Sequence, residues 1–317
     1  MSNIYDYEVV ENTQGKNEAK KITSKILLRL TISAVIALAI TNLIAVLFDR
    51  YFPHLITESF IIYLNDANTL IVFGLLYFTL KKEKSNKMYP TDTMNCKKFL
   101  TLICVSLSIM FVGSLVSNVI ASFVGGLSGS EIENPVDTII EKYDIFQIMI
   151  SVVIIAPIFE ELLFRKLIID KLSKYGTAFC MVFSGLTFGL FHANLYQILY
   201  ATLLGMLLAY IYMVYSKVSY VIILHSVINF IGSIVPMLIF SIDEKNEKLF
   251  INLTAIYGYI YFILMIIGIV YLIRLFKTYP YFSTSSSIKK PFNVLGKNTG
   301  VIIFLIYVIS LTIYNSI

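Results

Sequence analysis

The stretch from Phe159 to Arg165 places two acids and a base inside a segment that otherwise consists of apolar residues. Each charge near the centre of a bilayer costs about 2.5–3.5 kcal/mol, so such groups face a polar cavity, pair with one another or take part in chemistry. In a helix, Glu161 and Arg165 lie within reach of an ion pair, whereas Glu160 is rotated by roughly 100° and lacks that partner. Glu160 is therefore the candidate proton acceptor, and the other two are predicted to form a buried pair that supports the site.

Two histidines also lie deep in apolar runs, at His192 and His225. Phe188 precedes the first by four residues, and Asn229 follows the second by four, so each pair shares one face of its predicted helix. For either histidine alone, the alternative is a core residue that makes hydrogen bonds between helices. Their depth relative to Glu160 favours the functional interpretation.

That depth follows from the predicted turn at Tyr175–Gly176. Glu160 lies 16 residues before Gly176 and His192 lies 16 residues after it, so an antiparallel helical hairpin puts both about 24 Å from the turn. His225 is about 12 Å from Lys217, where its own helix is predicted to begin. We expect the acid and both imidazoles to meet at one level.

A carboxylate and an imidazole in one pocket can position and deprotonate a water molecule, and an imidazole with a carboxamide can donate hydrogen bonds to an oxyanion. These groups are sufficient to hydrolyse an amide. The sequence has no serine in a nucleophile-elbow setting and no His-Glu-x-x-His run, which leaves activated water as the predicted nucleophile. Glu160, His192 and His225 could alternatively supply three zinc ligands with an open fourth position.

The composition is that of a membrane protein. Of 317 residues, 57% are hydrophobic and 14% are charged, and the mean hydropathy is +0.79, which excludes an ordinary soluble domain. Three cysteines without paired spacing indicate free thiols.

We predict an all-α polytopic membrane protein of about eight to nine transmembrane helices with a four-helix catalytic core. The apolar segments are 26–48, 60–80, 99–124, 145–169, 177–196, 198–215, 218–240, 251–273 and 299–317. Within the fifth, Gly185 and Gly189 form a small-residue seam that permits a neighbouring helix to approach closely.

The predicted domains are a polar N-terminal tail (1–25), N-terminal transmembrane helices (26–144), a catalytic core (145–240) and C-terminal transmembrane helices (241–317). With the N-terminus in the cytoplasm, all 25 lysines and arginines fall on the cytoplasmic side except Arg50, Lys142, Lys245 and Lys248, as the positive-inside rule requires. The net charge of +5 is then a matter of topology and does not indicate nucleic-acid binding. A composition rich in Ile, Lys and Asn favours a bacterial cell membrane.

Three motifs follow one another on successive predicted helices, and together they resemble the CPBP family. This family comprises the CAAX prenyl proteases of type 2 and bacteriocin-processing or Abi-type intramembrane proteases. The resemblance covers about residues 145–240, and no motif position is missing. The motifs are Glu160-Glu161-x-x-x-Arg165, Phe188-x-x-x-His192 and His225-x-x-x-Asn229.

The resemblance implies a role for each motif residue. Glu160 and His192 would activate the water, His225 and Asn229 would form the oxyanion hole, and the Glu161–Arg165 pair with Phe188 would support the site. The family is described both as metalloproteases and as metal-independent glutamate proteases. Because Asn229 suits an oxyanion role better than zinc ligation, we expect no cofactor.

The favoured function is an intramembrane endopeptidase that cuts a peptide or membrane-protein substrate entering from the cytoplasmic leaflet, of the CAAX type or a bacteriocin or leader peptide. The alternative is a non-catalytic membrane scaffold or a bacteriocin self-immunity protein on the same fold. A transporter that uses the intramembrane acids as proton carriers would show inverted repeats, which the sequence lacks.

Overall fold

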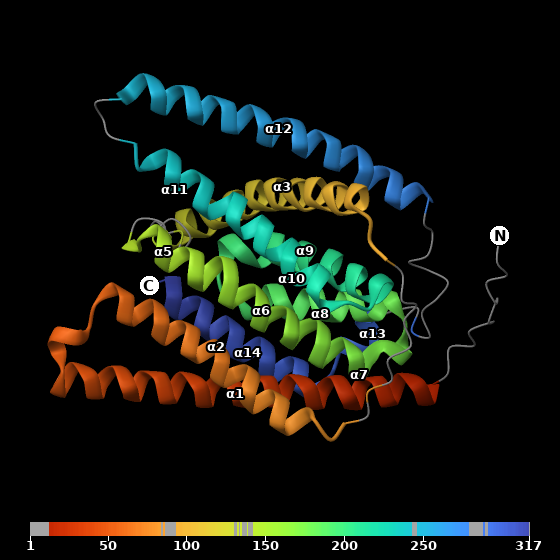
Figure 1. Cartoon of the computed structure of the whole chain (residues 1–317). Coiled ribbons are helices and arrows are strands. Elements are labelled where there is room, and N and C mark those ends of the chain that lie inside the picture. The colour runs from red at the N-terminus through yellow and green to blue at the C-terminus, as the bar shows by residue number, and fades with distance from the viewer. Residues whose placement is uncertain are drawn as a thin grey trace.

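The computed structural model describes residues 13–83, 85, 93–129, 132, 134, 138, 142–242, 246–278, 288 and 291–316. This part of the chain folds into helices and contains no strand, which confirms the predicted all-α class (Figure 1). The elements are α1 (Thr13–Tyr51), η1 (Pro53–Leu55), α2 (Glu58–Leu80), α3 (Cys96–Ser128), α5 (Ile145–Ile148), η2 (Met149–Ile155), α6 (Ala156–Glu161), η3 (Leu162–Ile169), α7 (Asp170–Leu172), η4 (Ser173–Tyr175), α8 (Thr177–Phe191), α9 (Leu195–Tyr215), α10 (Val218–Asn229), η5 (Phe230–Ile234), α11 (Val235–Phe240), α12 (Glu247–Thr278), α13 (Pro291–Leu295) and α14 (Thr299–Ser316).

Seven helical segments in the described residues are long and apolar enough to cross a membrane, and α8 and α14 are shorter apolar helices. Each of the nine predicted apolar segments coincides with one of these seven segments or with one of the two shorter helices. Helix α1 begins at Thr13, so the second half of the predicted polar tail is helical, while residues 1–12 lie outside the described residues. At 1.5 Å per residue, the 15 residues of α8 span about 22 Å, so this helix ends before it could cross a hydrocarbon core about 30 Å thick.

The segment that carries Glu160 runs from α5 to η4 and is interrupted by π-helical turns. One of them, η2, ends just before Pro157. Outside this segment, η5 lies between α10 and α11 and ends just before Pro236. Proline has no N–H for the helical ladder, and its ring clashes with the carbonyl four residues earlier, so a wider turn before each proline relieves the conflict. The third π-helical segment, η3, contains no proline and carries Arg165.

Helices α8 and α9 form the closest pair in the centre of the molecule. A Cβ atom at Gly185 would lie 2.8 Å from the backbone nitrogen of Met206, and one at Gly189 would lie 2.6 Å from the backbone nitrogen of Thr202. The predicted small-residue seam is therefore confirmed. The predicted turn before α8 is present as well, with Gly176 at a φ of 98° that favours glycine.

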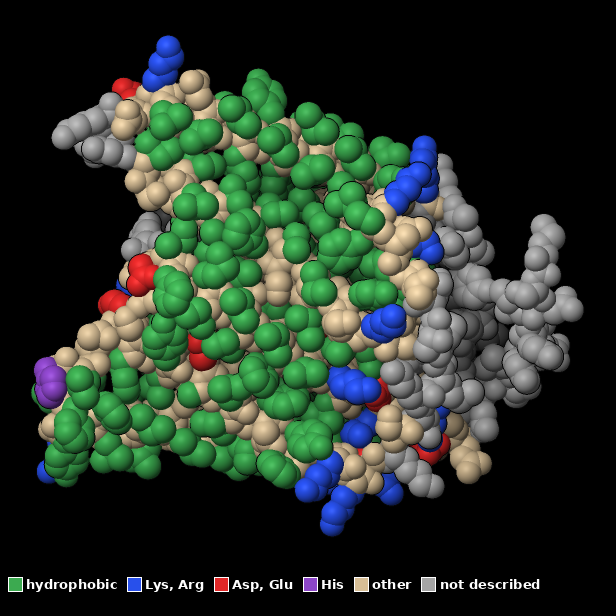
Figure 2. Space-filling view, viewed as in Figure 1, with side chains coloured by type: hydrophobic (Ala, Val, Ile, Leu, Met, Phe, Trp, Pro, Cys, Tyr) green, Lys and Arg blue, Asp and Glu red, His purple; other side chains and the backbone are tan. Residues whose placement is uncertain are grey.

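Charge and hydrophobicity divide the surface as a membrane requires. In Figure 2, hydrophobic side chains cover the middle of the visible face, and lysines and arginines gather at the end where α1 begins. Lys245, one of the four basic residues assigned to the opposite side, lies outside the described residues.

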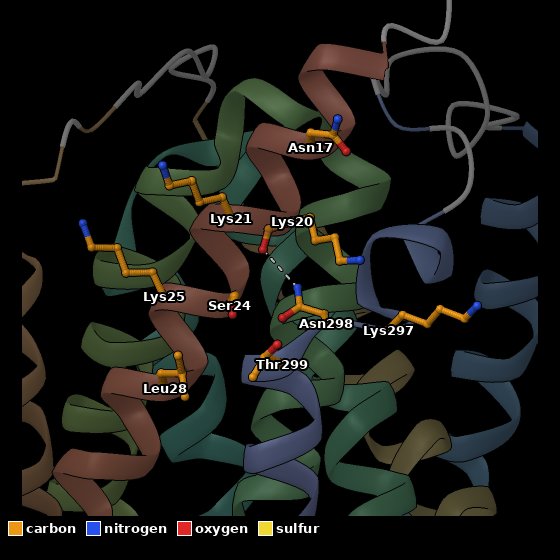
Figure 3. A pocket seen from close by; sticks show the side chains of 9 residues that line it. All are labelled: Asn17, Lys20, Lys21, Ser24, Lys25, Leu28, Lys297, Asn298 and Thr299. Atoms are coloured by element: carbon orange, nitrogen blue, oxygen red, sulfur yellow. Dashed lines mark hydrogen bonds between the residues drawn. The ribbon is translucent and has the colours of Figure 1, made fainter.

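At the basic end, α14 is fastened to α1. The Asn298 side chain donates hydrogen bonds to the carbonyl of Lys20 (3.0 Å) and the hydroxyl of Thr23 (3.1 Å), and its oxygen accepts from the Gly300 amide (3.1 Å). Figure 3 shows this junction beside a cavity of about 630 Å³ that contains none of the candidate catalytic residues. Its lining is Asn17, Lys20, Lys21, Ser24, Lys25, Leu28, Lys297, Asn298 and Thr299.

Candidate active site

The predicted pair of Glu161 and Arg165 is present and fully buried. Arg165 Nε lies 2.9 Å from Glu161 Oε2, with both side chains 0% exposed. The two groups meet as an ion pair without the alignment of a hydrogen bond. The guanidinium also lies over the ring of Phe188, with its central carbon 4.6 Å from the ring centroid, a cation–π contact. These contacts hold α8 against the helix that carries both acids.

His225, on α10, joins this pair from a third helix. Its Nδ1 lies 3.0 Å from Glu161 Oε1, and its Nε2 lies 3.9 Å from Glu160 Oε2. Glu161 therefore contacts Arg165 with one oxygen and His225 with the other. Because a carboxylate accepts hydrogen bonds, Nδ1 carries a proton and Nε2 is the nitrogen turned toward Glu160. The contact between His225 and Glu161 links two helices, and spacing along the sequence gave no signal of it.

The two adjacent acids differ in exposure. The Glu161 side chain is 0% exposed, whereas the Glu160 side chain is 22% exposed. A carboxylate that is partly accessible, with one imidazole nearby, can still bind a water molecule, while one that is buried between a guanidinium and an imidazole cannot. The structure thus distinguishes a partly accessible carboxylate at residue 160 from an enclosed carboxylate at residue 161.

His192 follows the last residue of α8. Its Nδ1 lies 2.8 Å from the Phe188 carbonyl, which can only accept, so Nδ1 is the donor and Nε2 is left for another partner. The Phe188 ring lies 4.9 Å from the His192 ring and 5.9 Å from the His225 ring, measured between centroids. Among the described residues, His192 makes no hydrogen bond or ion pair with Glu160 or His225; Phe188 connects the two imidazoles.

The level of His192 agrees with the predicted hairpin. Phe164 packs on Phe188 with ring centroids 5.2 Å apart, and both residues are equally far from Gly176. Glu160 and His192 each lie one helical turn further from Gly176 than these two phenylalanines. They therefore lie at the same level of the helical hairpin.

Asn229 lies one helical turn beyond His225 on α10. Its side-chain nitrogen donates a hydrogen bond of 2.8 Å to the carbonyl of Val152 in η2. The carboxamide carries two N–H groups, so this bond fixes its orientation and leaves a second donor.

The candidate residues do not fit a three-ligand zinc site in this arrangement. Within the part of the chain that the structure describes, no group of three or more His, Cys, Asp or Glu side chains is placed to hold a metal ion. His225 contacts Glu161 through Nδ1, and His192 does not converge on the other two residues of the alternative zinc set.

Comparison with known proteins finds one family model that matches this part of the chain. Residues 143–231 match the family model described as type II CAAX prenyl endopeptidase Rce1-like, and this range contains every motif residue named above. No curated protein and no solved structure matches the chain. The matched range agrees with the resemblance to the CPBP family. Residues 143–231 are therefore similar to the Rce1-like type II CAAX prenyl endopeptidases, a family of intramembrane proteases.

Proposed function

We propose that the protein is an intramembrane endopeptidase in which Glu160 activates a water molecule for attack on a peptide bond. The observation that supports this most strongly is the contrast between the two adjacent acids. Glu161 is enclosed by Arg165 and His225, while Glu160 stays partly exposed with His225 Nε2 at 3.9 Å. This leaves one carboxylate for proton transfer and uses the other to hold the site together.

The proposal uses both ring nitrogens of His225 as donors. Nδ1–H donates to Glu161, and Nε2–H, on the side of Glu160, points into the site. Glu161 then orients the ring much as a carboxylate orients a catalytic histidine in other hydrolases.

Two donors are then available for the oxyanion. One is Nε2–H of His225 and the other is the second N–H of Asn229, whose orientation is fixed by Val152. Donors held in place before the reaction stabilise the developing negative charge without reorganising. In this proposal His192 orients the water at the level of Glu160 through Nε2, which is not engaged by the Phe188 carbonyl.

The reaction balances without an additional reactant. Glu160 takes a proton from water as the water oxygen bonds to the carbonyl carbon, and the carbonyl oxygen becomes an oxyanion. When the carbon–nitrogen bond breaks, Glu160 returns the proton to the leaving nitrogen. The products are a carboxylate and an amine, with proton exchange to solvent.

We propose further that the N-terminus lies in the cytoplasm and that the substrate, a peptide or a membrane-protein segment, enters from that leaflet. Support comes from the gathering of lysines and arginines at the end where α1 begins (Figure 2). The matched family model bears the name of CAAX prenyl endopeptidases, so a farnesylated CAAX peptide is the first substrate to test. Bacteriocin or leader peptides are the second, in a bacterial membrane.

Glu160→Gln tests the mechanism because it keeps the size of the side chain and removes the base. We expect cleavage to fall about 10²- to 10⁴-fold, the usual contribution of a general base. The measurement is a comparative peptidomics of membranes that contain wild type or variant, followed by assay of the purified protein on the processed peptide and on a farnesylated CAAX peptide. Glu58→Gln, an exposed acid at the start of α2, is the matched control and should retain full activity. Unchanged cleavage by Glu160→Gln would overturn the proposal and leave the scaffold or immunity function.

A further inference from the structure

Asp66 is a second acid inside an apolar span, and the mechanism above does not use it. It lies in the middle of α2, which is long and apolar enough to cross a membrane. Its Oδ2 accepts a hydrogen bond of 2.6 Å from the hydroxyl of Ser151 in η2. Acids at such depth are costly and are kept where they pair with another polar group for structure or chemistry.

The hydroxyl of Ser151 behaves differently from most hydroxyls in the neighbouring spans. Those of Thr31, Ser106 and Thr187 each donate to the carbonyl four residues earlier in their own helix. Ser151 is only 3% exposed and donates across to another helix instead. This hydrogen bond therefore fixes η2 relative to α2, which a back-bonded serine would not do.

Helix α2 runs parallel to the helical segment from α5 to η4, which carries Glu160. The sequence separation between partners stays between 85 and 88 residues at every contact, and ring centroids 5.6 Å apart place Phe73 against the neighbour of Glu160. The constant separation means that α2 packs parallel to the helical segment that carries Glu160. The contacts are Ser59 with Gln147, Asp66 with Ser151, Phe73 with Phe159, and the Glu83 carbonyl with Lys171.

The residue that donates to Asp66 and the residue that accepts from Asn229 are adjacent in the chain. Ser151 is held by Asp66, and the carbonyl of the next residue, Val152, accepts the Asn229 amide at 2.8 Å. Both lie in η2, whose π-helical turn departs from the regular α-helical ladder. A shift of Ser151 therefore moves the acceptor that orients Asn229.

We propose that Asp66 is a positioning residue for the peptide hydrolysis. It touches neither the reacting atoms nor the water. By holding Ser151, it fixes η2 and thus the Val152 carbonyl, so that the second N–H of Asn229 faces the oxyanion. This inference rests on the proposed function, and it assigns a part in the reaction to a helix outside the matched range of 143–231.

The first test compares kcat and KM of the full-length variants on the peptide whose processing Glu160→Gln abolishes. Asp66→Ala should lower kcat about 10- to 100-fold, the usual effect of losing a partner that orients an active-site group, with KM unchanged. Asp66→Asn keeps an oxygen that can accept from Ser151 and should retain most of the wild-type kcat. Asn65→Ala, at the exposed neighbouring position, is the control and should match wild type.

The second test asks whether Asp66 acts through Asn229. In the Asn229→Ala background, Asp66→Ala should cause no further loss of kcat, because the group that it positions is already absent. Ser151→Ala removes the same hydrogen bond while keeping the acid, and it should reproduce the loss if Asp66→Ala fails to fold.

Two results would overturn the inference and leave the proposed function intact. One is wild-type kcat in both Asp66→Ala and Ser151→Ala while Glu160→Gln is inactive. The other is an equal fall in kcat in the presence and absence of the Asn229 side chain. Full activity of Glu160→Gln would instead remove the hydrolytic function itself.

Discussion

At the level of single residues, the site depends on contacts among four ionisable side chains from two helices. They are Glu160, Glu161, Arg165 and His225. Glu161 contacts Arg165 at 2.9 Å and His225 at 3.0 Å, and all three side chains are buried. A buried ion pair contributes little by itself, but removing one partner leaves an uncompensated charge and costs about 3–5 kcal/mol. The supporting acid should therefore be more important for stability than the reactive one.

Glu161→Gln tests this difference. We expect it to lower the free energy of unfolding by about 3–5 kcal/mol and to abolish activity, since Arg165 loses its counter-charge and His225 its orienting group. Thermal unfolding of the purified protein in detergent, beside Glu160→Gln, gives the comparison. The double variant Glu161→Leu/Arg165→Met should regain stability without regaining activity. Equal stability of wild type and Glu161→Gln would contradict the assignment.

Sequence spacing found the contacts that lie within one helix and missed those between helices. The spacing of four residues gave the Glu161–Arg165 pair, and equal distances from Gly176 gave the level of His192. The contact of His225 with Glu161 and the bond from Asn229 to Val152 depend on how α10 packs, which no local pattern encodes. The catalytic roles stay predictions until variants are measured.

At the scale of elements, close packing of α8 on α9 sets the position of His192. Nothing lies within 4 Å of a Cβ placed at Gly258 on α12, whereas a Cβ at Gly189 would meet backbone atoms of α9 at 2.6 Å. Backbone cannot yield as the end of a flexible side chain can, so the two glycines should differ in their tolerance of a methyl group.

Gly189→Ala should lower the free energy of unfolding by about 1–3 kcal/mol, the usual cost of overpacking a filled interface. It should also reduce activity, because α8 carries both Phe188 and His192. Gly258→Ala is the matched control and should leave both quantities unchanged. The measurements are thermal unfolding and peptide cleavage. A neutral Gly189→Ala would contradict the close packing of α8 on α9.

The helices were predictable, but their π-helical turns were so only in part. Runs of apolar residues about 20 long specify spans directly; each of the nine predicted segments coincides with a helix, and seven of these helical segments, among the described residues, are long enough to cross a membrane. Pro157 and Pro236 carried a signal for η2 and η5, because proline disturbs the preceding turn. For η3, which has no proline, the sequence offered no such sign.

At the scale of the whole molecule, the arrangement of charge predicts the orientation in the membrane. Cys96 is a free, exposed thiol at the start of α3, at the predicted cytoplasmic side, whereas Cys104 and Cys180 are buried. A membrane-impermeant maleimide should therefore label inside-out vesicles and leave intact cells unlabelled.

Cys96→Ser should abolish this labelling. His54→Cys, placed in the Cys96→Ser background at an exposed position on the opposite side, should reverse the pattern and react in intact cells. Labelling of Cys96 from outside would contradict the proposed orientation and, with it, access of substrate from the cytoplasmic leaflet.

Because α2 packs parallel to the helical segment that carries Glu160, residues 143–231 cannot be moved into another protein without it. Sequence similarity begins at residue 143, yet a chimera cut there would leave Ser151 and Phe159 facing a foreign or missing neighbour. The smallest portable unit is therefore discontinuous: it needs the graft from 143 to 231 together with the second helix, although α3 and its flanking loops separate the two along the chain.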